Sequence, residues 1–391
     1  MPAPPRPCIV ASQDVRVLAN GVNTHTRLLV AALARLGAPP RAVVTPVDSA
    51  AGRARLFAGR VRGRLARDPD RRALEDLERR HALLVAHLRA RPEVADSEVV
   101  HAQDFVAAAA LLDALGPSRP PLVLAHHANA LPAAELSHRL GLSPTARAVA
   151  WAERESRRAF AAAARVVAVS PWAARALAAD GAVAPERLAT VPNGVPVPDA
   201  PPPAADREAG LVLAVGQVVE RKGFDVLVDA MARLARTRRV GAAKAVVLGD
   251  GPERARLVAR AQRAGAPVTF PGAVADVGAW LARAGVFALP SRAENLPMAL
   301  LEAMAQGLAA VASEVGGVAE ALAPDGGPPA GLLVPPGDVD ALAAALERLL
   351  TDPDLARAMG ERAHALARAR HSLEAMARAW LEVYAGAALP G

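Results

Sequence analysis

Two glutamates, Glu294 and Glu302, stand eight positions apart in a segment that changes from a polar loop into a short apolar helix. Pro297 suits the first helical position and Gly307 a left-handed stop, so the helix should begin just after Glu294. At about 1.5 Å of rise per residue the two carboxylates would lie roughly 10 to 12 Å apart, too far to share a metal ion or a proton. Unpaired amides at the helix N-terminus between them would attract a phosphate or diphosphate. Either both are ordinary solvated carboxylates, or they bind the two ends of a long ligand with the shape of a sugar nucleotide.

The residues around these glutamates resemble a known signature. Leu289-Pro-Ser291, the run from Glu302 to Gly307 and Val315-Gly-Gly-Val-Ala-Glu320 are similar to the donor site of the family 4 retaining glycosyltransferases. Three upstream motifs extend the likeness over nearly all of the C-terminal half: Gly216-Gln-Val-Val-Glu-Arg-Lys-Gly223, Gly249-Asp-Gly-Pro252 and Val191-Pro-Asn-Gly-Val195. The resemblance implies transfer of a hexosyl group, with retention, from a nucleotide-diphosphate sugar to an acceptor hydroxyl. It implies no cofactor and no metal ion, and UDP-hexose is the first expected donor, ahead of GDP-mannose.

The elements that would position these residues alternate between short apolar runs and amphipathic stretches, which predicts parallel sheets with crossover helices. Strands are expected at 9–12, 42–45, 99–101, 122–125, 166–169 and 188–191 in the first half, and at 211–215, 245–248, 268–270, 286–289, 309–312 and 332–334 in the second. The candidate motifs of the second half follow strand ends. We therefore expect them to converge on the carboxyl edge of one doubly wound sheet, where ligands bind in such domains.

The chain should form two domains, because 391 residues are too many for one core. We predict an α/β fold of two Rossmann-like, doubly wound domains that face each other across a cleft, the GT-B arrangement that the resemblance also implies. Residues 1–195 would bind the acceptor, 196–207 form a Pro-rich linker, 208–371 bind the nucleotide sugar, and 372–391 form a helix that packs back on the first domain. The Pro-rich run 192–203 cannot hold a helix or a central strand, so the hinge is expected there.

The resemblance also implies individual roles in the second domain. Glu294 would hold hydroxyls of the donor sugar, Lys222 would neutralise the diphosphate, and Glu302 would bind the ribose hydroxyls. Further substrate contacts are expected from helix-start residues, loop glycines and the Gly216 motif: Asn295, Leu296, Met298, Gly216, Gly249, Gly316, Gly317, Gln217 and Arg221. Lys222 is one of two lysines in an Arg-rich chain, which suggests a specific function, although codon usage could also explain it. Gln217 stands where the family usually has Arg, so Arg221 or another cation would have to compensate.

In the first domain the resemblance implies a glycine loop that precedes a helix over 27–36. Gly21 of this loop would lie near a phosphate, and Asn20 replaces a second glycine. A plain strand-to-helix turn explains Gly21 nearly as well. His126 and His127 follow a strand that should end at the cleft. Spacing favours His127 as the catalytic histidine beside the donor sugar and leaves His126 as a second contact. His101, Gln103 and Asp104 would either line the acceptor pocket or serve the fold. Asn193-Gly194 should shape the turn into the linker.

Composition limits the alternatives. Hydrophobic residues make up 52% and aromatics 3%, so the cores should consist of Ala, Val and Leu. The single cysteine, Cys8, and the lack of an apolar leader or spanning run suggest a cytoplasmic protein. The charge of +7 and the pI near 10.8 would suit nucleic acid, but no aromatic reading surface or zinc spacing accompanies them. Only the stretch 53–91, with twelve Arg against five acidic residues, concentrates charge. It would be a solvated helical pair, a patch for an acidic acceptor or for peripheral contact with a lipid surface, or a partner interface.

Two other functions remain open from the sequence. A sugar-nucleotide epimerase of related fold would need acid and base carboxylates that the chain does not show, and it would lack the segment from Glu294 to Gly307. A catalytically inactive partner subunit is supported only by Gln217 and Asn20. The acceptor is not named by any motif. A soluble small molecule is favoured slightly over a lipid-linked acceptor, and the oligomeric state is open.

Overall fold

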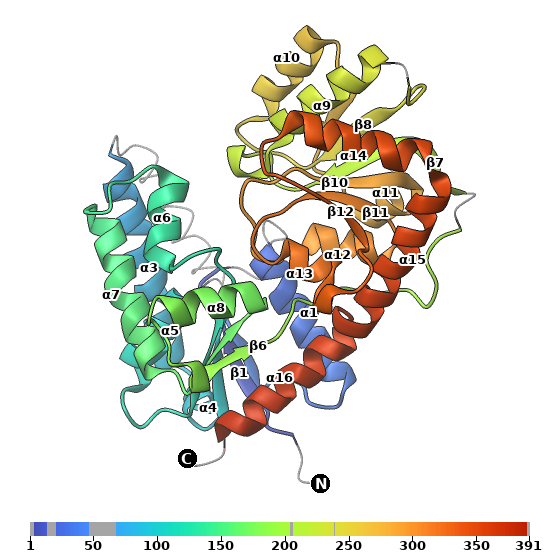
Figure 1. The fold of residues 1–391 in the computed structure, drawn as a ribbon. Helices are drawn as coiled ribbons and strands as arrows, with labels where there is room; N and C mark the ends of the chain where they lie inside the picture. The colour runs from blue at the N-terminus through green and yellow to red at the C-terminus, as the bar shows by residue number, and fades with distance from the viewer. Residues whose placement is uncertain (1–3, 14–20, 47–67, 204–205, 238, 389–391) are drawn as a thin grey trace. The chain divides into compact units, whose positions relative to one another are not determined.

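The chain folds into two compact α/β units in the computed structural model, which describes residues 4–13, 21–46, 68–203, 206–237 and 239–388. The first unit comprises Met1–Pro192 and Glu374–Gly391, and the second comprises Asn193–Leu373. Each contains a six-stranded parallel sheet with helices packed against it (Figure 1). The expectation of two doubly wound, Rossmann-like domains is therefore confirmed, and all twelve expected strands are present.

The sheet of the first unit has the strand order β2-β1-β3-β4-β5-β6. Its strands are β1 (Pro7–Val10), β2 (Ala42–Val44), β3 (Val99–Ala102), β4 (Leu122–His126), β5 (Arg165–Ala168) and β6 (Leu188–Thr190). The helices are α1 (Gly21–Arg35), α3 (Pro69–Arg89), α4 (Pro92–Ala95), α5 (Phe105–Leu115), α6 (Pro132–Leu140), α7 (Arg147–Ala162), α8 (Pro171–Ala179), the 3-10 turn η1 (Pro185–Arg187) and the last helix, α16 (Leu373–Ala388). The strand order reverses between β1 and β3, which makes their carboxyl ends the expected ligand edge of this unit.

The sheet of the second unit has the order β12-β11-β10-β7-β8-β9. Its strands are β7 (Glu208–Val215), β8 (Lys244–Leu248), β9 (Val268–Gly272), β10 (Ala284–Leu289), β11 (Ala309–Ser313) and β12 (Gly331–Val334). The helices are α9 (Phe224–Thr237), α10 (Arg254–Ala264), α11 (Val277–Arg283), α12 (Met298–Ala305), α13 (Val318–Leu322), α14 (Val339–Thr351) and α15 (Pro353–Arg370), with 3-10 turns η3 (Glu220–Lys222) and η4 (Pro324–Gly326). Here the order reverses between β7 and β10, so the loops that follow these two strands are adjacent at the switch point.

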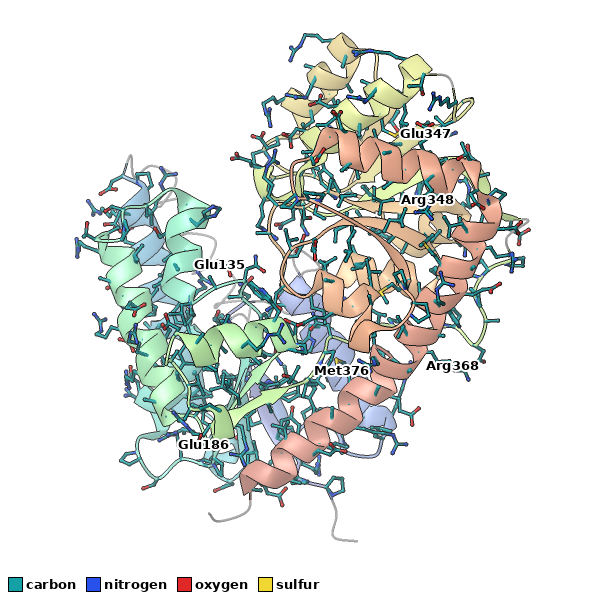
Figure 2. The ribbon with its side chains drawn as sticks, in the orientation of Figure 1. Glu135, Glu186, Glu347, Arg348, Arg368 and Met376 are labelled. Carbon is teal, nitrogen blue, oxygen red and sulfur yellow. The ribbon has the colours of Figure 1, made fainter. Side chains whose placement is uncertain are left out.

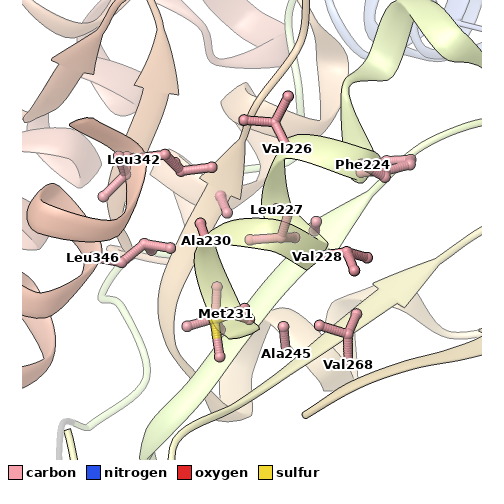
Figure 3. Packing of buried hydrophobic residues seen from close by; sticks show 14 of the residues in the cluster. Phe224, Val226, Leu227, Val228, Ala230, Met231, Ala245, Val268, Leu342 and Leu346 are labelled. Atoms are coloured by element: carbon pink, nitrogen blue, oxygen red, sulfur yellow. The ribbon is translucent and has the colours of Figure 1, made fainter. Parts of the chain in front are cut away.

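The core of the second unit consists of aliphatic side chains, as its composition predicts. Helix α9 buries Leu227 and Met231 against β8 and β9, where Ala245 and Val268 belong to the same cluster (Figure 3). In the first unit α5 is buried along most of its length because it carries alanines that allow close packing. Cys8 lies within this core in β1, and burial raises the pKa of its thiol to about 12. Cys8 is thus a structural residue.

Two expectations about the elements change, and a third is met. Helix α1 begins at Gly21, six residues before the expected start at Arg27, and it buries Asn23, His25 and Thr26. Pro297 precedes α12 as its N-cap instead of opening it, whereas Gly307 has φ of 66° and ends the helix as expected. The run 192–203 contains no helix and no strand of a sheet, as predicted. An isolated β-bridge pairs Val195 of this run with Ser372.

The basic stretch 53–91 is described only from residue 68 onward. Its described part contains the helix α3, and the rest of the stretch, on which the expected helical pair also depends, lies outside the described residues. Helix α3 buries four leucines and pairs Arg71 with Glu75 at 2.8 Å and Arg80 with Asp76 at 2.6 Å. Ion pairs also occur on the second unit: Glu347 and Arg348 are neighbours on α14 (Figure 2), and Glu347 lies 3.3 Å from Arg239. No helix in the described ranges is long and apolar enough to span a membrane.

Candidate active site

Glu294 lies in the loop between β10 and α12 and is buried, with 6% of its surface exposed. Its Oε1 accepts hydrogen bonds from Lys222 Nζ at 2.5 Å and Ser291 Oγ at 2.7 Å, and its Oε2 accepts one from Arg221 Nη1 at 3.2 Å. Burial by itself raises the pKa of Glu294, but the charges of Lys222 and Arg221 and the hydrogen bonds lower it below its ordinary value overall. Glu294 is therefore a carboxylate held between two cations.

Lys222 reaches Glu294 because two glycines allow the backbone to approach. Gly223 has φ of 63°, and a Cβ there would lie 1.9 Å from the carbonyl oxygen of Pro290. The loop after β7 can therefore contact the loop after β10 only with glycine at this position. A Cβ on Gly216 would lie 3.3 Å from Lys222 Cε, so Gly216 leaves room for the lysine stem. The structure thus brings together Lys222 and Glu294, which are 72 residues apart in the sequence.

Gly249 follows β8 and packs on the same edge. Its φ is 134°, and a Cβ would lie 1.9 Å from the carbonyl oxygen of Gly216. Its N–H donates to Gly272 at 2.9 Å, while Gly216 donates to Leu248 at 2.9 Å. Both glycines therefore build the strand-end edge itself, and their predicted contact with substrate stays a prediction.

Gly316 and Gly317 contact the Glu294 loop. Gly316 has φ of 56°, and a Cβ there would lie 1.7 Å from the Glu294 carbonyl oxygen. The N–H of Gly317 donates to the carbonyl of Asn295 at 2.8 Å. This glycine pair therefore supports the loop that carries Glu294. Its predicted close approach to a nucleotide is untested by these contacts.

The first turn of α12 begins at Met298, which is half-buried. Amides in the first turn of a helix lack acceptors within the helix, so those of Met298 and Ala299 suit an anion. Asn295 and Leu296 lie before the helix, and both are buried. The carbonyl of Leu296 accepts from Asn193 Nδ2 at 2.9 Å, so the Asn193 turn is connected to this loop.

Glu302 lies on α12, half-buried, and among the described residues its carboxylate has no ion pair or hydrogen-bond donor. Burial raises its pKa to about 7. Glu294 and Glu302 therefore differ in character: one is an ion-paired carboxylate, and the other is close to half-protonated at neutral pH. A group that donates hydrogen bonds to Glu302 would favour its ionised form.

Two arginines accompany Lys222 at the site. Arg221 donates to the carbonyl of Ala293 at 2.8 Å as well as to Glu294, and 36% of its side chain is exposed. Arg292 is bound by both oxygens of Asp225, at 2.8 and 2.7 Å, and so its charge is already balanced. Gln217 is exposed directly after Gly216. Arg221 is thus the cation that shares the carboxylate with Lys222, and its predicted compensation for Gln217 stays a prediction.

In the first unit, His126 is the last residue of β4 and is buried against Phe160, with ring centroids 5.9 Å apart. Burial lowers its pKa to about 4. His127 follows, half-buried, with Nε2 3.0 Å from Gln103 Oε1. Burial, and then the proximity of His25 and His126, hold the pKa of His127 well below its ordinary value. Both imidazoles are therefore neutral at pH 7.

Of the two alternatives for His101, Gln103 and Asp104, the contacts favour a role in the fold. His101 and Gln103 are fully buried. Asp104 caps α5 by accepting from Ala107 N at 2.9 Å and also accepts from Ser12 N at 3.0 Å, which ties the ends of β1 and β3 together. Gly21 is exposed at the first position of α1, so it lies in the helix and not in the loop expected before it. Asn20 lies outside the described residues.

Two family models together match most of the chain. The model described as "Glycosyl transferases group 1" matches residues 200–366, and that described as "Glycosyltransferase Family 4" matches residues 19–197.

The chain belongs to glycosyltransferase family 4.

Curated relatives agree with this membership. The chain is 36% identical over 169 residues to the alpha-D-kanosaminyltransferase of Streptomyces kanamyceticus. This match covers 42% of each protein. It is 37% identical over 164 residues to the GDP-mannose-dependent alpha-(1-6)-phosphatidylinositol monomannoside mannosyltransferase of Mycobacterium tuberculosis, covering 39% of the chain and 41% of the relative. The matches span less than half the length of these two relatives. Among solved structures, sucrose-phosphate synthase from Thermosynechococcus elongatus has the same fold, with a TM-score of 0.76 at 23% identity over 97% of the chain and 98% of its own.

The sequence reasoning missed two contributors to this family 4 site. Ser291 hydrogen-bonds Glu294, and Asp225 neutralises Arg292. A serine two residues after a strand and three residues before a glutamate was a usable signal for the first. Asp225 gave no comparable signal, because its partner lies 67 residues away on another strand's loop.

Proposed function

We propose that this protein transfers a hexosyl group from a nucleotide-diphosphate sugar to an acceptor hydroxyl, with retention at the anomeric carbon. The proposal depends above all on one observation. The buried carboxylate of Glu294 is held by Lys222 and Arg221 in the loops after β7 and β10. These loops meet at the switch point of a doubly wound sheet, where such domains bind nucleotides.

The diphosphate would bind between Lys222 and the first-turn amides of α12. A lysine and a helix N-terminus both favour negative charge, and each gains strength where water is excluded. As the bond to the sugar breaks, charge grows on the departing diphosphate, and preorganised donors of this kind contribute on the order of 3 kcal/mol each. Family membership supports this assignment, and the exposed face of Arg221 supplies a second cation.

The two glutamates would hold the sugar and the ribose. An ionised carboxylate offers about four acceptor positions, and the three donors at Glu294 leave about one for a sugar hydroxyl. Glu302 has both oxygens available among the described residues, which suits the paired hydroxyls of a ribose. The sequence spacing of Glu294 and Glu302 is consistent with opposite ends of one donor.

Retention would follow from attack by the acceptor on the same face that the diphosphate leaves. A donor phosphate oxygen would take the acceptor proton. Glu294 is a poor nucleophile because Lys222, Arg221 and Ser291 engage both of its oxygens. His127 would contact the donor sugar as a neutral imidazole. The proposed chemistry uses no resident cofactor or metal ion.

The donor and the acceptor are proposed by class. UDP-hexose remains the first candidate, and the name of the M. tuberculosis relative makes GDP-mannose the second. A soluble small molecule is the first candidate for the acceptor and a lipid-linked one the second. No described feature favours the epimerase, whereas an inactive partner subunit would bind nucleotide without turnover.

The test is NMR observation of sugar release from UDP-glucose, UDP-galactose and GDP-mannose, which are all α-linked donors. Retention predicts that the α anomer of the released sugar appears first, before mutarotation. Lys222→Met should lower the rate by about 10²- to 10³-fold, whereas Lys244→Met, at a lysine remote from these loops, should not change it. A β anomer formed first would contradict retention. Binding of a nucleotide with neither sugar release from any donor nor transfer to any acceptor in a panel would favour the inactive subunit.

A further inference from the structure

A chain of buried polar side chains connects the last helix, α16, to His127 within the first unit. The Tyr384 hydroxyl lies 2.7 Å from His101 Nδ1. His101 Nε2 lies 3.3 Å from Gln103 Nε2, and Gln103 Oε1 lies 3.0 Å from His127 Nε2. We refer to Tyr384, His101, Gln103 and His127 together as the polar chain. Tyr384, His101 and Gln103 are fully buried, so water does not compete for their hydrogen bonds.

The protons of the polar chain can be arranged in two directions. Each histidine is neutral, because burial lowers the pKa of His101 to about 3 and that of His127 well below its ordinary value. A neutral imidazole has one N–H donor and one acceptor nitrogen. A half-turn of the Gln103 amide exchanges its oxygen and nitrogen, so the same positions fit either direction of donation. The direction decides which nitrogen of His127 carries the proton.

Tyr384 selects the direction. Its hydroxyl must donate a proton to an acceptor, and His101 Nδ1 is the acceptor that the described residues provide. His101 then carries its proton on Nε2, which needs the Gln103 oxygen as acceptor. This direction needs the Gln103 amide turned by half a turn from the orientation given above, so that its NH₂ group points to His127 Nε2, which accepts. The opposite direction would leave the buried O–H of Tyr384 without an acceptor.

We propose that Tyr384, through His101 and Gln103, fixes His127 as the tautomer with its proton on Nδ1. The described residues place no hydrogen-bond partner at this nitrogen. His127 then presents a donor, not a base, to whatever binds beside it. A donor of this kind would bind an oxygen of the sugar or of the departing phosphate. That consequence rests on the proposed function, whereas the tautomer does not. Tyr384, His101 and Gln103 are accordingly positioning residues.

The test is long-range ¹⁵N–¹H NMR of protein labelled at its nine histidines, with His127 assigned from the signals lost in His127→Gln. The parent should show His127 protonated on Nδ1. Tyr384→Phe removes the selecting hydroxyl, and His127 should then move substantially to the Nε2–H tautomer. Gln103→Glu offers only acceptor oxygens and should move it fully to Nε2–H.

Trp380→Phe is the matched control. Trp380 precedes Tyr384 by one turn on α16 and stacks on His101 with centroids 4.2 Å apart, but its Nε1 bonds to none of the described residues. The His127 tautomer should therefore persist in this variant. An Nε2–H tautomer in the parent, or an unchanged Nδ1–H tautomer in folded Tyr384→Phe, would overturn the proposal. Neither outcome depends on sugar transfer, so failure here is distinguishable from failure of the proposed function.

Discussion

Lys222 Nζ lies 2.5 Å from Glu294 Oε1, and this ion pair joins the loop after β7 to the loop after β10. Glu294 is buried, with 6% of its side chain exposed, and Lys222 is largely buried, with 12% exposed. Removing one partner of a buried pair leaves the other charge in a poorly solvated place. The charges proposed to bind the donor therefore also stabilise the unit that carries them.

Lys222→Met should lower the free energy of unfolding by about 3 kcal/mol at pH 7, because Glu294 would keep only Arg221 and Ser291. Urea unfolding measures this. Lys244→Met is the matched control: Lys244 pairs with Glu208 at 2.6 Å, but its side chain is 53% exposed, so the loss should stay below about 1 kcal/mol. Equal losses in the two variants would contradict the account.

The loss in Lys222→Met should also depend on pH. The folded-state pKa of Glu294 lies below its unfolded value, so the stabilisation is present above the unfolded pKa and is lost as pH falls through the folded pKa. The difference between parent and Lys222→Met should therefore shrink in acid. A difference that stays constant down to the acid limit of folding would show that packing, not charge, sets it.

The contribution of Glu302 to the free energy of unfolding should have the opposite pH dependence. Burial raises its folded pKa to about 7, so its contribution is most favourable below the unfolded pKa near 4.5 and is lost as pH rises through 7. Glu302→Gln should therefore stabilise the protein by on the order of 2 to 3 kcal/mol at pH 8 and have little effect at pH 4. Glu361→Gln, at a side chain that is 60% exposed, is the control and should show no such trend.

Nucleotide affinity should rise as pH passes upward through 7, because the ribose hydroxyls would donate to an ionised Glu302. Calorimetric titration with the best nucleotide diphosphate between pH 6 and pH 8.5 measures the slope. In Glu302→Gln the affinity should be lower and nearly independent of pH over this range, apart from ionisation of the nucleotide. An identical slope in that variant would remove Glu302 from the binding site.

Gly316→Ala separates close approach from backbone strain. Its Cβ would lie 1.7 Å from the Glu294 carbonyl oxygen, so the loop must shift, and the loss should exceed the roughly 1 to 2 kcal/mol of a left-handed alanine. Gly337 has φ of 81°, and no atom lies within 4 Å of a Cβ added there, so Gly337→Ala should show the backbone strain alone. Thermal unfolding compares the two, and a loss in Gly316→Ala no larger than in Gly337→Ala would contradict the packing described here.

Much of the fold was predictable because apolar runs ending in Gly or Pro mark buried parallel strands. The family motifs also predicted that Lys222 and Glu294 belong to one site, and the structure brings these two side chains together, while their roles toward a donor stay predictions. The start of α1 was not predictable, because Val22, Asn23 and Thr24 have low helix propensity. Burial of Asn23, His25 and Thr26 within the first unit outweighs this low helix propensity.

Long-range partners were beyond sequence reasoning. Tyr384 and His101 are separated by 283 positions, and no local pattern shows that they meet. Asp104 could have been foreseen as a helix cap, since it precedes the apolar run that begins at Phe105. Glu294 and Glu302 are the same residue type, so the sequence does not show that their pKa values are shifted in opposite directions. The difference comes from their burial and their partners in the fold.

The most direct test of the donor site is a thermal-shift screen of the protein against UDP, GDP, ADP and their sugars, with Lys222→Met, Glu302→Ala and Lys244→Met beside it. A ligand at a hundred times its dissociation constant stabilises by about 2.7 kcal/mol, which such a screen detects. The account predicts that one nucleotide diphosphate stabilises the parent and Lys244→Met, and that Lys222→Met and Glu302→Ala lose the shift. No shift from any nucleotide, or a shift that survives in both site variants, would contradict it.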